Sequence, residues 1–326
     1  MPDIIQFIHP GGQYQIDKHS NRYCWNKKYT KGIYFWNSGA HCRKFIRSNG
    51  DYVDKNDKFV GSEELLFWGE WEPCSHFQML ENSANNPFLP HHIHSPKYCL
   101  ENQGTMNTDP LIFGTVFYYS NCNNKVQSLQ LTPGSIILFG TNYLKPKKST
   151  PCFVLDTVFI VKERIPYSVK NWKSGLDFKQ GDILYDITLS KIQKGNYNLY
   201  TGENYSNNKK HFSFVPVKKY DQNSKKGFER AKFYLDAKKG KNYLKDIQSV
   251  RLGFAYFKRN ESIKQCQKFW DLLVANIRKQ GFELGVRFDN PPNAEKKSCC
   301  CDENPVSQNQ EQKAKKVSGC SEKKVC

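Results

Sequence analysis

The chain has 326 residues, of which 38% are hydrophobic and 14% aromatic, so it can bury a large core and is not a disordered protein. It has no run of eighteen apolar residues, which excludes a membrane-spanning helix, and its first residues do not resemble a secretory signal. We therefore expect a soluble, cytoplasmic protein whose twelve cysteines are mostly reduced thiols, and the formal net charge of +18 favours a polyanionic partner.

The sequence predicts an α+β fold in three segments. Residues 1–165 should form a β-rich domain with a candidate pocket, residues 166–292 a smaller basic α/β portion, and residues 293–326 a disordered tail rich in Cys and Lys. The second segment has 25 Lys and Arg against 12 Asp and Glu, so most of the positive charge lies there. The tail's cysteines lie beside lysine pairs, which leaves lipidation as an alternative to an inert tail.

Short apolar runs between Pro, Gly and Asn turns predict the strands, and one segment has a clear helical period. A helix should run from Ser262 to Gln280, because Ser262 and Gln265 form a capping box and Gly281 ends the pattern. The predicted strands are Leu65–Trp71, Leu111–Tyr119, Ser135–Gly140, Cys152–Val161, Ile183–Leu189, Tyr197–Thr201, Phe212–Val217, Ala231–Leu235 and Phe282–Phe288.

Two carboxylates in the first of these strands suggest acid–base chemistry. Strand alternation puts Trp68, Glu70 and Glu72 on one face and Trp71 on the other, with the carboxylates on the order of 7 Å apart. Partial desolvation beside Trp would disfavour their charged forms, as in a general acid or base, and we assign both Trp residues to a ligand pocket. The alternative is a structural strand whose carboxylates pair with Arg43 and Lys44.

Asp156 is the second unusual carboxylate. Alternation places it between Val154 and Val158 on an apolar face, where a lone carboxylate needs a cationic or hydrogen-bonding partner. That partner could be Arg43, His41 or a ligand. We therefore include Asp156 and His41 with the candidate catalytic residues and Arg43 with the ligand-binding ones.

Lysines and aromatic residues alternate between residues 209 and 243. Lysines neutralise phosphates and aromatic faces accept unstacked bases, so this mixture favours nucleic acid. The alternative is a compositional bias toward Lys. The predicted phosphate-binding surface comprises Lys209, Lys210, Lys218, Lys219, Lys225, Lys226 and Arg230.

Two metal patterns have little support. His92 and His94 lie in a proline-bounded segment without further ligands at a recognised spacing, so we predict a solvated loop and no metal. Asp221, Asp236 and Lys238 resemble the acid followed by acid-x-Lys pattern of the restriction-endonuclease superfamily, which would imply metal-assisted phosphodiester hydrolysis.

The run Gly114–Tyr118, the turn and strand Leu131–Gly140 and the strand around Asp156 together resemble a small β-barrel of the PUA, ASCH or EVE type. The likeness covers residues 111–165, and it implies recognition of RNA or a modified base.

The leading prediction is a protein that binds or processes nucleic acid or nucleotides, with no cofactor identified. The alternatives are a carboxylate-dependent hydrolase of a glycan or peptide, and the metal-dependent nuclease.

Overall fold

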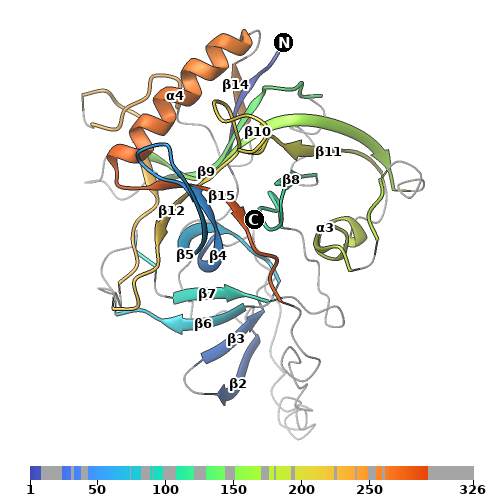
Figure 1. The fold of residues 1–326 in the computed structure, drawn as a ribbon, viewed down its shortest axis with the longest axis vertical. Coiled ribbons are helices and arrows are strands. Elements are labelled where there is room, and N and C mark those ends of the chain that lie inside the picture. The colour runs from blue at the N-terminus through green and yellow to red at the C-terminus, as the bar shows by residue number, and fades with distance from the viewer. Residues whose placement is uncertain are drawn as a thin grey trace, which may run out of the picture.

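The structure is a computed structural model, and it contains two mixed sheets and two α-helices among the residues that it describes (Figure 1). The described residues are 1–8, 24–30, 33–37, 43–73, 75–81, 89–90, 92–97, 108–120, 130–143, 151–169, 176–179, 181–191, 195–223, 226–238, 241–248, 255–258 and 261–292.

The first sheet has seven strands and includes the long strand that carries Asp156. Its order is β14 (Ala255–Lys258), β1 (Ile4–Ile8), β9 (Ile136–Tyr143), β10 (Cys152–Ser168), β11 (Asn196–Gly202) and β8 (Tyr118–Tyr119), while β13 (Ala231–Tyr234) also pairs with β10. The end strands β14 and β8 do not pair with each other in the described chain, so closure into a barrel is not confirmed.

The second sheet has eight strands and includes the strand that carries Glu70. Its order is β15 (Glu283–Phe288), β12 (Val215–Lys219), β5 (Phe59–Glu70), β4 (Arg43–Val53), β7 (His92–Pro96), β6 (Ser75–Met79), β3 (Ile33–Asn37) and β2 (Cys24–Thr30). Strand β15 also pairs with β4.

Helix α4 (Ile263–Lys279) confirms the predicted helix and its capping box, and the positive φ of Gly281 follows its end. It lies at the opposite end of the molecule from β2 and β3 (Figure 1). Its apolar stripe includes Phe269, Trp270 and Leu273 and is buried in the core.

The predicted strand Ile183–Leu189 is wrong. This segment forms α3 (Ile183–Ile187) and a 3-10 turn, η1 (Leu189–Lys191), after an N-cap at Asp182. Ile183, Leu184 and Ile187 are spaced so that one helical face buries all three in the core. A short apolar run fits a strand or a buried helix equally well, which is why the local pattern misled.

The predicted strand Leu111–Tyr119 is largely irregular. Only Tyr118 and Tyr119 form β8, and Leu111 adds an isolated bridge to Tyr118. Leu111 and Phe113 are nevertheless fully buried, so the segment serves as core without a continuous ladder.

Two apolar cores lie on opposite faces of the seven-stranded sheet. Ile5 and Phe7 of β1 enter one core, while Ile4 and Ile8 enter the other with the apolar stripe of α4. Burial on both faces explains why β1 and β9 are nearly continuous apolar runs.

The sheets do not follow the predicted division at residue 165. That residue lies inside β10, and each sheet contains strands from both sides of the division. The strand-rich α+β class is confirmed, and the two predicted segments contribute jointly to both sheets and both cores.

A β-bulge interrupts β10 at Asp156. Leu155 pairs with Gly140 and Thr157 with Phe139, so Asp156 is the extra residue between them. As a result Leu155 and Val158 face the same core, and the uninterrupted alternation that we predicted for this strand is wrong.

The bulge leads to a test of Gly140. A Cβ atom there would lie 2.3 Å from the carbonyl oxygen of Val154 and 2.5 Å from the ring of Phe153. We expect Gly140→Ala to lower the free energy of unfolding by roughly 1–3 kcal/mol, measured by chemical denaturation.

The matched control is Gly61→Ala in β5, where the nearest atom would lie at an ordinary 3.5 Å. Gly61→Ala should be close to neutral. Equal stability of the two variants would contradict the close approach at the bulge.

Candidate functional site

Four charged side chains form a buried network between the two sheets. Arg43 of β4 pairs with Glu70 of β5, and its Nε lies 2.6 Å from Oδ2 of Asp156 on β10. The Nε of Arg230 lies 3.4 Å from Oδ1 of the same Asp156, and all four side chains are at most 3% exposed. Two cations and two carboxylates therefore balance within the core.

Burial lowers the pKa of Arg230 to about 10, while Asp156 acts to raise it and Arg43 to lower it further. Arg230 remains charged at neutral pH, and the network is held together by opposite charges. A buried charge that loses its partner is costly, so each member depends on the others.

Arg230 also fixes the chain segment before β13. Its guanidinium carbon lies 4.7 Å from the centre of the Trp68 ring, and the Trp68 Nε1–H donates a 2.8 Å hydrogen bond to the carbonyl of Phe228. The Phe228 ring packs edge-on against Phe45 of β4 at 4.7 Å. The segment Phe228–Arg230 is thus held against the eight-stranded sheet.

The structural alternative for the predicted carboxylate site is met at Glu70, whereas Lys44 donates to backbone carbonyls. Glu70 pairs with Arg43, as the register of β4 and β5 requires, and the ammonium of Lys44 donates to the carbonyls of Trp71 and Pro73. Glu72 lies beyond the end of β5.

Trp68 of β5 and Trp71, which directly follows β5, belong to different cores. Trp68 packs with Phe45 and Leu66, whereas Trp71 belongs to the large core and contacts Phe113 edge-on. The structure agrees with the prediction that these two side chains point in opposite directions. It does not place them in one common pocket. His41 lies outside the described residues.

A basic cavity is lined by Arg230 at the edge of the buried network. It has a volume of about 690 Å³ and is bordered by β12, the segment before and within β13, and the chain around the end of α4. Its cations are Lys218, Arg230, Lys232, Lys241 and Lys279, its rings are Phe228, Tyr234 and Phe282, and its carboxylate is Glu229.

Lys218 lies between two rings of this cavity. Its Nζ is 5.1 Å from the centre of Phe228 and 5.0 Å from that of Phe282. Burial lowers the pKa of this half-buried lysine. Within the described parts of the chain no carboxylate forms an ion pair with it, so its charge is available to an incoming anion.

The other predicted basic residues lie apart from this cavity. Lys219 pairs with Glu63 at 2.9 Å, and alternation along β12 turns it away from Lys218. Lys209 and Lys210 line a different cavity of about 550 Å³. Lys226 is exposed, and Lys225 lies outside the described residues.

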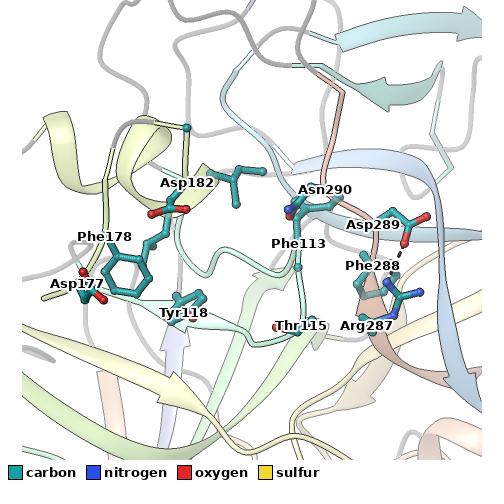
Figure 2. Close-up of a pocket in the computed structure, with 14 residues that line it drawn as sticks. Phe113, Thr115, Tyr118, Asp177, Phe178, Asp182, Arg287, Phe288, Asp289 and Asn290 are labelled. Atoms are coloured by element: carbon teal, nitrogen blue, oxygen red, sulfur yellow. Dashed lines mark hydrogen bonds and ion pairs between the residues drawn. The ribbon is translucent and has the colours of Figure 1, made fainter.

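A further cavity of about 500 Å³ has the opposite electrostatic character (Figure 2). Figure 2 shows Asp177 and Asp182 on one side and Asp289 with Arg287 on the other. Arg287 pairs with Asp289 and also with Asp51, so its charge is already balanced. The carboxylates make this cavity unfavourable for phosphate.

We predicted that the histidine pair lies in a solvated loop, and this prediction is wrong. His92 and His94 belong to β7 and are buried, because β7 lies between β4 and β6 in the sheet. His94 Nδ1 lies 2.7 Å from Oγ of Ser75, and burial lowers its pKa well below the ordinary value, with smaller contributions from Lys44 and His92. The described residues contain no group of three side chains arranged to hold a metal.

The nuclease pattern coincides with two local turns. The carboxylate of Asp221 accepts from the backbone N–H of Asn223, and that of Asp236 accepts from the backbone N–H of Lys238, each at 2.9 Å. Asp and Asn commonly stabilise turns in this way.

No protein-family model, curated protein or solved structure matches this chain. The likeness of residues 111–165 to PUA, ASCH or EVE barrels therefore stays a prediction. No helix in the described ranges is long and apolar enough to cross a bilayer.

The buried network leads to a test of Asp156. Asp156→Ala removes the carboxylate shared by Arg43 and Arg230, and we expect it to lower the free energy of unfolding by roughly 3–5 kcal/mol. Chemical denaturation measures this value.

The control is Glu64→Ala, which breaks a pair with Arg47 at 3.2 Å whose side chains are 32–38% exposed, and it should cost less than about 1 kcal/mol. If both variants lost the same stability, Asp156 would not hold a buried network.

Proposed function

We propose that the protein binds nucleotides or nucleic acid through phosphate at the basic cavity. The observation that carries this proposal is the Lys218 ammonium, held between the rings of Phe228 and Phe282 in a cavity with four other cations. Phosphate-binding sites use such cations, and neighbouring aromatic faces accept planar bases.

The balance of charge at the cavity supports an anionic ligand. Arg230 is compensated by Asp156, and Lys232 pairs with Glu229. Lys218, Lys241 and Lys279 add positive charge beyond these pairs, and a concave surface focuses that field.

The proposal is one of binding rather than acid–base catalysis. The side chains of Glu70 and Asp156 are at most 1% exposed and are paired with Arg43, so a substrate would have to break the buried network to reach them. Their contribution is to hold Arg230 and the wall of the cavity in place.

Lys218→Met tests the proposal, because Met keeps the apolar stem between the rings and removes the charge. We expect affinity for a nucleoside triphosphate to fall by at least about tenfold, since charge-assisted hydrogen bonds are worth about 1.5–3 kcal/mol. Calorimetric titration at several salt concentrations measures both the affinity and its salt dependence.

Lys219→Met is the matched control, since Lys219 is the next residue of β12 and pairs with Glu63 on the other side. It should bind like the parent. Equal losses in the two variants would indicate a nonspecific effect of net charge, and an unchanged Lys218→Met would place the phosphate elsewhere.

A further inference from the structure

We infer that the basic cavity holds a single nucleotide and does not track a nucleic-acid duplex; this inference rests on the proposed function. The volume of about 690 Å³ lies within the range of cavities that enclose small ligands, about 300–1,000 Å³. The cavity is thus large enough for one nucleotide.

The arrangement of the lysines argues against a duplex. A duplex presents a phosphate about every 1.7 Å along its axis, so a protein that follows it needs cations along an extended surface. Lys219 is instead occupied by Glu63, and Lys209 and Lys210 line a separate cavity beside Tyr205. The predicted phosphate-binding residues that the structure describes are therefore divided between separate sites, and Lys218 and Arg230 are the ones that line the basic cavity.

The lining of the cavity offers a different partner to each part of a nucleotide. Lys218, Lys241 and Lys279 suit the phosphates, and the partly exposed rings of Phe228 and Tyr234 offer apolar surface to a base. The carboxylate of Glu229 is about one third exposed and pairs with Lys232. A carboxylate repels phosphate and accepts hydrogen bonds, so Glu229 suits ribose hydroxyls or a base N–H group.

Binding of three probes at physiological ionic strength tests this inference: the four ribonucleoside triphosphates, inorganic triphosphate and a short mixed-sequence DNA duplex. We expect at least one nucleoside triphosphate to bind one per chain and at least about tenfold more tightly than inorganic triphosphate. Lys218→Met should weaken this binding by at least about tenfold, and the duplex should not compete for the site.

Glu229→Gln supplies a second measurement. Loss of its negative charge should raise the affinity for inorganic triphosphate and reduce the preference for the nucleoside triphosphate. Glu63→Gln is the control, because Glu63 pairs with Lys219 away from the cavity, and it should leave that preference unchanged.

The outcomes separate the inference from the proposed function. Duplex binding that competes with nucleotide and is lost in Lys218→Met would overturn the single-nucleotide inference and leave the proposed function intact. Inorganic triphosphate that binds as tightly as every nucleotide would overturn the inference in the same way. Absence of binding by all three probes would overturn the proposed function itself.

Discussion

The carboxylate of Asp156 is the point on which the arrangement of this protein depends. It is the extra residue of a β-bulge, and it bonds two arginines that belong to different parts of the chain. Arg43 connects it to β4 and β5, so one carboxylate links the seven-stranded sheet to the eight-stranded one. Because the link is buried, removing any one of its charges leaves another charge without a partner, and the link then destabilises the fold.

The same network forms the back of the basic cavity. Arg230 reaches from Asp156 across the Trp68 ring, and Trp68 holds the carbonyl of Phe228. Gly227 precedes this segment at a close approach, since a Cβ there would lie 2.1 Å from Cγ of Pro90. The ring of Phe228 is therefore fixed beside Lys218, and the stability of the core and the shape of the cavity share one cause.

Local patterns in the sequence predicted some elements well. They failed where contacts between residues far apart in the sequence determine the structure. Helix α4 was predictable because its cap, apolar stripe and terminal glycine all lie between Ser262 and Gly281. The segment Ile183–Leu189 was mistaken for a strand because its short apolar run does not distinguish the two structures. The bulge at Asp156 depends on the pairing of β10 with β9, which no local pattern reveals.

The candidate site was only partly predictable for the same reason. Arg43 could be named as a partner of Glu70 and Asp156, because buried carboxylates need cations. The ring of Phe282 reaches Lys218 only because β12 pairs with β15, where Val217 lies opposite Glu283. Nothing in the sequence near Lys218 identifies that ring, and nothing distinguishes Lys218 from Lys219 until alternation along β12 is known.

A double-mutant cycle between Asp156 and Arg230 tests most directly whether this network holds the cavity wall to the sheets. The free energy of unfolding would be measured for the parent, Asp156→Asn, Arg230→Gln and the double variant. We predict a coupling energy clearly above about 0.5 kcal/mol, because the two groups share one buried network. Losses that add within about 0.5 kcal/mol would show that the two residues act independently and would contradict this account.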